Sequence, residues 1–430
     1  MIVLEDAMSE LDAIDFFTDA SIVNDPNPFF DHLRSKCPVF REPHHGVMMV
    51  TGYDEALEVF KHPETFSSCV AVTGPIPPLP FTPRGEDISE QLERHAREMP
   101  WSAHLVCLDG QRHAALRAIL TAMLTHTRLK RNEEYVALLA DRLIDNFIGD
   151  GRCEFVSDYA HALSTLVIAD LLGVPEEDRD ELLELLGQPP TQIGGDPVHK
   201  VAPDPLAFLD ARFTAYLEER RGHARGDMMS DLANARFKDG SLPELAVPVR
   251  LAKFLFGAGQ DTSARLMAAT LRTLGESPEL QQRLRNERQR IPDFIEETLR
   301  LESPAKALSR LARSATSIGG VPVPAGTIVT MGLGAANRDP RRFEAPDELN
   351  LDRSNLRDHI AFSRGTHACP GAPLARAETR ITLEKFLDRM SDIRICEERH
   401  GPLHARRYIY EPTYLLRGLT ALHIEFDAVR

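Results

Sequence analysis

The chain carries, late in its sequence, Phe362-Ser363-Arg364-Gly365-Thr366-His367-Ala368-Cys369-Pro370-Gly371, in which one cysteine lies between two glycines. A helical pattern follows from Pro370 to Met390, with Pro370 expected at the first helical position, where its missing N–H costs nothing. Cys369 would then lie at a helix N-terminus, where free N–H groups and the helix dipole favour a thiolate. Gly365 and Gly371 would permit positive φ and let a large flat group approach the backbone. Such a thiolate indicates a metal held mainly by a cofactor, and haem is the best candidate.

Two simpler interpretations of Cys369 are a small buried side chain and a zinc ligand. Zinc is disfavoured because no two of the six cysteines form a Cys-x-x-Cys pair. The pattern Phe-x-x-Gly-x-His-x-Cys-x-Gly resembles the haem-ligand signature of the cytochrome P450 family of haem-thiolate monooxygenases. The resemblance implies one haem b with Cys369 as its axial ligand, and further cofactor contacts from Phe362, Gly365, His367 and Gly371.

The resemblance also implies the fold, which is mainly α with a small β-rich part, an α+β triangular prism of about a dozen helices around one haem. We expect one domain over residues 1–430, its β-rich part drawn mainly from about 36–66, 308–335 and 394–427 and its helical body from the rest. Local patterns agree with this order: residues 28–35 and 53–61 are helical in type, and residues 46–51 form a strand pattern.

Composition narrows the class of partner. The 430 residues are 43% hydrophobic and carry 65 acidic against 50 basic side chains, a formal charge of −15, which argues against nucleic acid. The scattered cysteines fit a reducing compartment. We find neither a signal peptide nor a run of about 18 apolar residues, so we expect a cytoplasmic protein without a membrane partner, unlike the membrane-anchored branch of the family.

A long apolar helix is predicted over residues 251–274, although Gly257 and Gly259 each cost about 1 kcal/mol against alanine. A flat ligand against the helix, or a local widening, would explain them. Ala258-Gly259-Gln260-Asp261-Thr262 is similar to the family motif on the helix above the haem. The resemblance implies that Ala258 contacts the cofactor and that Asp261 and Thr262 are the catalytic pair that delivers protons for O₂ cleavage. Alone, the motif could be a polar notch at a helix bend.

Cationic side chains are expected to bind the haem propionates. His113 and Arg117 are spaced i,i+4 on one helical face, where they could clamp a carboxylate or simply face solvent. The family has Asp-Pro-Pro-x-His-x-x-x-Arg here, and this chain has Gly110-Gln111 in place of the two prolines, which puts the entry turn in doubt. The resemblance adds Arg310 and His367 as propionate contacts.

A structural set is implied by Glu297 and Arg300, the Glu-x-x-Arg pair of the family, joined by Arg353. In isolation such an i,i+3 pair is a common surface pair worth a few tenths of a kcal/mol. The resemblance implies that it is buried instead and fixes the loop before the cysteine. No catalytic role is assigned to it.

Substrate contacts are expected from two loops and from several apolar residues. The Pro-rich loop 74–81 would cover the pocket, or be a surface connection without a role, and a Gly/Pro-rich lid is expected over 188–205. Lys306 could pair with an acidic substrate group or be a solvated lysine. The candidate contacts are Ile76, Leu79, Phe81, Leu255, Lys306, Ala307 and Tyr414.

The resulting interpretation is a bacterial-type monooxygenase, expected as a monomer, that inserts one oxygen atom of O₂ into a small to medium apolar organic substrate. Its electrons would come from a separate iron–sulfur ferredoxin, or a flavodoxin, docked on a basic patch of Arg112, Arg364, Arg376 and Arg380. Two alternatives stay open. One is a peroxide-driven or non-oxygenating haem-thiolate enzyme, disfavoured by Asp261 and Thr262, and the other is a non-catalytic haem-binding protein.

Overall fold

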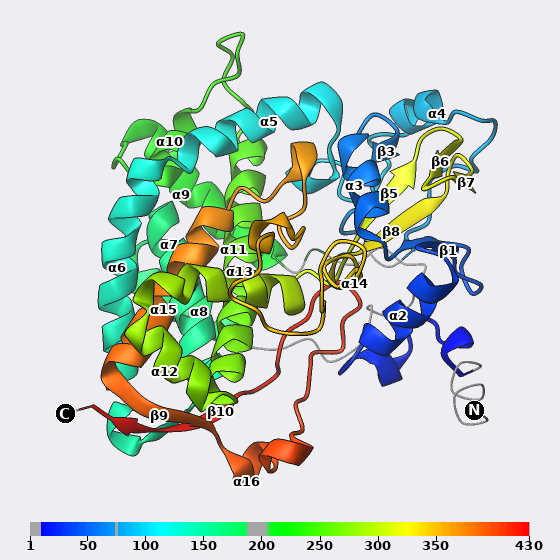
Figure 1. The fold of residues 1–430 in the computed structure, drawn as a ribbon. Helices are drawn as coiled ribbons and strands as arrows, with labels where there is room; N and C mark the ends of the chain where they lie inside the picture. The colour runs from blue at the N-terminus through cyan, green and yellow to red at the C-terminus, as the bar shows by residue number, and fades with distance from the viewer. Residues whose placement is uncertain (1–9, 74–75, 187–203, 205, 430) are drawn as a thin grey trace, which may run out of the picture.

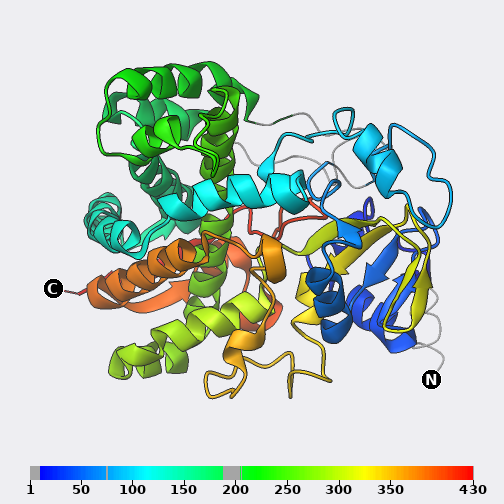
Figure 2. The same cartoon turned by 90° about the horizontal axis from the view of Figure 1, so that it is seen from above.

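The computed structural model of the chain describes residues 10–73, 76–186, 204 and 206–429. Helices gather on one side of the molecule and the largest sheet, with the N-terminal helix α2, Asn27–Lys36, lies on the other (Figures 1 and 2). The fold class is therefore the predicted one, mainly α with a small β-rich part. None of the described helices combines the length and apolarity that crossing a membrane requires.

Three sheets make up the β-rich part. The five-stranded sheet has the order β1-β2-β8-β5-β3, in which β2 and β8 are parallel and the other neighbours antiparallel. A three-stranded sheet has the order β4-β10-β9, and β6 and β7 form a hairpin. The strands are β1 Val39–Arg41, β2 Met48–Val50, β3 Phe66–Ser67, β4 Arg152–Glu154, β5 Ala307–Ala312, β6 Thr316–Ile318, β7 Val321–Val323, β8 Ile328–Gly332, β9 Met390–Ile395 and β10 His423–Ala428. The short β4 lies in a part of the chain expected to be helical, because its three residues carry too little pattern to be recognised.

The helical body is organised around α11, which passes through it from end to end (Figure 1). Its apolar residues form one continuous core with those of α6, α7, α9, α13 and α15, so that most of α11 is buried. The remaining helices are α3 Tyr53–Lys61, α4 Ser89–Arg94, α5 Gly110–Met123, α6 His126–Asp145, α7 His161–Leu172, α8 Arg179–Leu186, α9 Asp210–Gly222, α10 Met228–Asn234, α11 Ala246–Gly275, α12 Pro278–Asn286, α13 Ile291–Leu301, α14 Leu333–Ala336, α15 Ala372–Arg389 and α16 Glu397–His400.

Local chemistry sets several helix ends. Ser277 caps α12 by accepting from the Leu280 N–H, and Pro278 follows in the first turn. Gly173 ends α7 in the left-handed region at φ 89°, where glycine pays no Cβ penalty. The expected helices over 53–61 and 251–274 are present as α3 and the longer α11.

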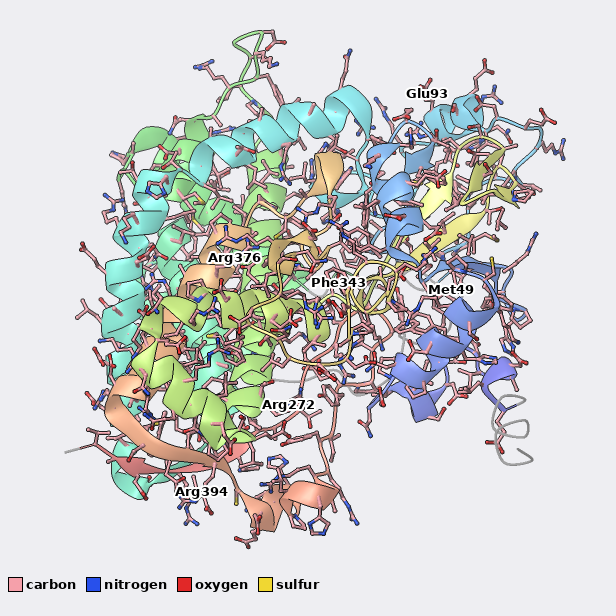
Figure 3. The ribbon with its side chains drawn as sticks, viewed as in Figure 1. Met49, Glu93, Arg272, Phe343, Arg376 and Arg394 are labelled. Carbon is pink, nitrogen blue, oxygen red and sulfur yellow. The ribbon has the colours of Figure 1, made fainter. Side chains whose placement is uncertain are left out.

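A buried charge set ties α13 to the loop that precedes the cysteine. Glu297 accepts from Arg300 at 2.7 and 2.9 Å and from the Arg353 Nε at 3.1 Å, and neither Glu297 nor Arg300 has solvent exposure. Arg300 also donates to three backbone carbonyls and lies 5.3 Å from the ring centre of Phe343, labelled in Figure 3. The guanidinium of Arg300 thus fixes the course of the loop that follows α14.

We expect Glu297→Gln to lower the free energy of unfolding by about 3–5 kcal/mol, because two buried guanidinium groups would lose their shared carboxylate. Urea unfolding of the variant and the wild type measures the difference. The matched control is Lys130→Met, which breaks an exposed i,i+3 pair with Glu133 and should change stability by less than about 0.5 kcal/mol. Equal effects of the two variants would contradict the buried role.

Candidate functional site

Cys369 lies at the end of a tight loop, and its side chain is exposed. Its N–H donates to the Phe362 carbonyl at 2.9 Å, which closes the loop. This bond explains why the prediction for Pro370 is wrong: the helix begins at Ala372, with Gly371 as N-cap and Pro373 in the first turn. Desolvation by the surrounding protein raises the pKa of the Cys369 thiol, whereas the N–H groups of Gly371 and Ala372 and the charge of Arg117 lower it. The expected thiolate-favouring helix end is therefore present two residues later than predicted.

Only one of the two glycines in this loop is required by the conformation of the backbone. Gly365 has φ 71°, and a Cβ there would lie 2.5 Å from the Phe60 carbonyl oxygen at the end of α3. Only glycine permits this contact, which fixes the cysteine loop against the β-rich side of the molecule. Gly371 has φ −83°, and its Cβ would meet the Cys369 Sγ at an ordinary 3.9 Å. The expectation of positive φ is therefore wrong at Gly371.

Four cationic or imidazole side chains converge beside this loop. Arg117 of α5 donates to the Ala368 carbonyl, and the rings of His113 and His367 lie 4.0 Å apart. Arg310 of β5 is 5% exposed and donates to the Ser309 carbonyl at 2.8 Å. The four residues predicted to bind propionates thus come together from α5, β5 and the cysteine loop.

This group lacks a counter-charge among the residues that the structure describes: no carboxylate pairs with Arg117, Arg310 or His113, and the buried His113 Nε2 has no partner. Asp109, the nearby acid, is paired with Arg313 at 2.6 Å. Burial lowers the pKa of Arg310 to about 10 and that of His367 to about 3. A buried uncompensated cation is costly, so the donor set fits the two propionates of a haem.

Thr262 and Ala258 lie one turn apart on α11. The Thr262 hydroxyl donates to the Ala258 carbonyl at 2.7 Å, and the Ala258 side chain is exposed on the helix surface. The two glycines beside them approach side chains from other parts of the chain. A Cβ on Gly257 would lie 2.3 Å from Leu206, and one on Gly259 3.4 Å from Ile168. A shift of the flexible Leu206 side chain would make room at Gly257, and the contact at Gly259 is an ordinary one, so the flat ligand expected beside these glycines stays a prediction.

Asp261 has a partner that the sequence analysis missed. Arg265, one turn further along α11, lies 3.0 Å from the Asp261 carboxylate and 2.5 Å from Glu411. The i,i+4 spacing of Asp261 and Arg265 is visible in the sequence and could have identified the first contact. The second contact spans 146 positions and leaves no local signal.

Glu378 is a second missed acid. It lies on α15 with 1% exposure, bonds Ser263, the residue after Thr262, and has an Oε2 atom without a partner among the described residues. Burial raises the pKa of Glu378 to about 8, so it is protonated at neutral pH. The carboxyl group that meets Ser263 of α11 is therefore neutral.

The candidate substrate residues divide between several parts of the fold. Leu79 and Phe81 pack on the cluster around α4, whereas Ile76, Ala307 and Tyr414 belong to the cluster around the N-terminal phenylalanines. Leu255 lies in the core along α11. Of the expected lid, residues 188–203 and 205 lie outside the described residues. Contact of these candidates with a substrate stays a prediction.

Lys306 is buried, and its ammonium group has two partners. It donates to the Thr413 carbonyl at 2.8 Å and lies 5.7 Å from the ring centre of Phe16. Burial lowers its pKa to about 7. An acidic substrate group would have to displace these contacts.

The four arginines of the expected basic patch differ in pairing. Arg376, labelled in Figure 3, is held by Glu296 at 2.6 Å, and Arg380 by Glu133 and Glu384. Arg364 donates only to the carbonyls of Arg357 and His359, so its charge stays uncompensated within the described chain, and the same is true of the exposed Arg112. Beside them runs a groove lined by His113, Ala114, Arg117, Ala118, Thr121, Ala122 and Thr366.

Comparison with known proteins gives one consistent family. The family model described as Cytochrome P450 matches residues 209–399. Cytochrome P450 144 of Mycobacterium tuberculosis is 33% identical over 386 residues, which is 89% of this chain and 86% of the relative. The biotin biosynthesis cytochrome P450 of Bacillus subtilis is 28% identical and covers 95% of this chain and 98% of its own. Among solved structures, the substrate-free form of Mycobacterium marinum cytochrome P450 CYP150A6 has a TM-score of 0.91, with 53% identity over 98% of this chain and all of its own.

We expect the stability of Glu378→Gln relative to the wild type to rise with pH. The pKa of Glu378 is about 8 in the folded chain and about 4.3 when unfolded, so the wild type loses stability as pH rises through this window. Glutamine does not ionise, so the free energy of unfolding of the variant minus that of the wild type should increase by on the order of 3 kcal/mol between pH 5 and 8. Urea unfolding at both pH values measures it.

The control for this titration is Glu384→Gln, a half-exposed acid on the same helix. Its effect should vary little over the same window. A stability gap for Glu378→Gln that stays constant with pH would contradict the protonated state.

Proposed function

Because this chain belongs to the cytochrome P450 family, we propose that it inserts one oxygen atom of O₂ into a small to medium apolar organic substrate. The family comprises haem-thiolate monooxygenases, and its cofactor is haem. In the proposed reaction, substrate, O₂, two electrons and two protons give the hydroxylated product and water. The observation that carries the proposal is the exposed Cys369 thiol beside the buried Arg310 and the partly buried Arg117, neither of which has a carboxylate partner among the described residues.

Cys369 would hold the haem iron, and His113, Arg117, Arg310 and His367 would bind the propionates. Bound haem supplies the activation of O₂. The chain's own contribution is to hold the cofactor in one orientation and to deliver protons at the hydroxyl oxygen of Thr262. That hydroxyl donates to the Ala258 carbonyl, so its lone pairs are free to accept a hydrogen bond from an ordered water or from Asp261 when Asp261 is protonated.

A separate iron–sulfur ferredoxin would supply the electrons. Two features support this part of the proposal. The charges of Arg112 and Arg364 have no carboxylate partner in the described chain, and the groove beside them leads to Arg117. An acidic protein surface would be attracted to such a region even though the chain as a whole carries a charge of −15.

We expect oxygen-18 from O₂ to appear in product when the enzyme turns over with a surrogate ferredoxin system. Compounds are first chosen by the shift they cause in haem absorption. Thr262→Ala should lower product formed per electron pair by about tenfold or more, with peroxide released instead, because the proton-delivering hydroxyl is lost. Thr262→Ser retains the hydroxyl and should keep most of the product yield.

Other outcomes of this experiment identify the alternatives. Product formed only with added peroxide would indicate a peroxide-driven enzyme. Haem binding without any product would indicate a non-catalytic haem-binding protein. Equal yields from Thr262→Ala and the wild type would contradict the proposed proton delivery.

We expect the double variant Arg112→Gln, Arg364→Gln to be reduced by the ferredoxin on the order of tenfold more slowly at low ionic strength, with a shallower salt dependence. Stopped-flow reduction at several salt concentrations measures both quantities. Arg394→Gln is the control, since Arg394 lies on β9 at the bottom of the view, whereas α5, which carries Arg112, lies at the top (Figures 1 and 3). A salt-independent wild-type rate would contradict electrostatic docking.

A further inference from the structure

One guanidinium group on α11 is shared between two carboxylates. The Arg265 Nη2 atom lies 3.0 Å from Asp261 on its own helix and 2.5 Å from Glu411. Glu411 belongs to the stretch between α16 and β10, residues 401–422, called here the C-terminal segment. The Arg265 and Glu411 side chains are 4% and 3% exposed, whereas Asp261 is 24% exposed. Asp261 is thus the solvent-facing member of a buried set.

The C-terminal segment holds this guanidinium in place. Glu411 donates its N–H to the Gly418 carbonyl at 2.9 Å, and a Cβ on Gly418 would lie 2.4 Å from the Arg265 Nη1 atom. The buried Nε and Nη1 atoms of Arg265 have no partner among the described residues. Arg265 therefore serves both acids through Nη2 alone, and the missing side chain of Gly418 leaves room for its guanidinium group.

The charges in this set do not balance. Two carboxylates face one guanidinium, and the remaining neighbour, His161 of α7, is neutral at neutral pH because burial lowers its pKa. Burial, with a contribution from Asp261, raises the pKa of Glu411, whereas Arg265 lowers it. The groups that face Asp261 are thus Arg265 and Thr262 from α11, Glu411 from the C-terminal segment and His161 from α7. Full neutralisation of the set requires one added proton.

We propose that Glu411 is a positioning residue for proton supply: by taking a share of Arg265, it leaves Asp261 weakly paired and able to bind and release protons. Asp261 takes a proton from solvent on its exposed side and passes it to the Thr262 hydroxyl. Without Glu411, Arg265 would hold Asp261 as a fixed carboxylate, which accepts protons poorly. This inference rests on the proposed role of Asp261 and Thr262 in the monooxygenase reaction.

The test is Glu411→Gln in the haem-loaded, full-length chain, which keeps the side-chain shape and removes the competing charge. Infrared titration follows the carboxyl band that disappears in Asp261→Asn. We expect this band to appear only at lower pH in Glu411→Gln than in the wild type, because Arg265 would then hold the Asp261 carboxylate alone. The solvent deuterium isotope effect on O₂-dependent turnover should also rise. An unmoved Asp261 band in a folded Glu411→Gln protein overturns the inference.

Two further variants keep the test decisive. Tyr410→Phe removes only a hydroxyl that accepts from Arg272 at 3.0 Å, so it perturbs the same segment and should leave the Asp261 band unchanged. If Glu411→Gln does not fold, Glu411→Asp withdraws the carboxylate from Arg265 and should shift the band in the same direction, and an unmoved band there also overturns the inference. Full coupling in Asp261→Asn would instead refute the proton role of Asp261, a separate failure of the proposed function.

Discussion

Positive charge buried without a counter-charge is the constraint on which the arrangement of this molecule depends. Arg310 is placed by β5, Arg117 by α5 and His367 by the cysteine loop, and these three elements meet where an anion is required. Burial lowers the pKa of Arg310 to about 10, which measures how poorly the protein alone solvates this group. A dianionic cofactor relieves that cost and thereby stabilises the folded chain that binds it.

The same site depends on two close backbone contacts. Gly365 presses on the Phe60 carbonyl, and the Cys369 N–H closes its loop on Phe362. The buried ion pairs of Glu297 with Arg300 and Arg353 hold the segment that precedes that loop. The position of the thiol is therefore determined by packing and hydrogen bonds within the chain itself, which is the usual requirement for a preorganised site.

The parts of this site that were predictable from the sequence are those with local signals. The helix α3 and the central helix α11 follow from hydrophobic spacing, and the glycine-enclosed Cys369 follows from a ten-residue pattern whose family the comparisons confirm. The convergence of His113 and Arg310 came only through resemblance, since nothing in their spacing requires it. The helix start predicted at Pro370 was wrong by two residues, because the sequence pattern does not show that the chain first closes a loop through the bond from the Cys369 N–H to the Phe362 carbonyl.

The parts that escaped prediction are contacts over long sequence separations. Glu411 meets Arg265 across 146 positions, and Glu378 meets Ser263 across two helices, so neither residue carries a local mark of its role. The close approach of Leu206 to Gly257 is a contact of the same kind, made between residues 51 positions apart. Substrate positions are the extreme case, because their identity depends on loop geometry that hydrophobic pattern does not encode.

The parallel pairing of β2 with β8 has a consequence for how the chain matures. Residues 48–50 pair with residues 329–331, so the first strands to leave the ribosome wait for most of the chain before their sheet can close. The contact of Gly365 with Phe60 requires a still longer wait. Loop closure over such distances is slow, and unpaired strand edges stay open to other chains meanwhile. The proposed iron ligand Cys369 comes later still in the chain than β8, so its site too is complete only near the end of synthesis.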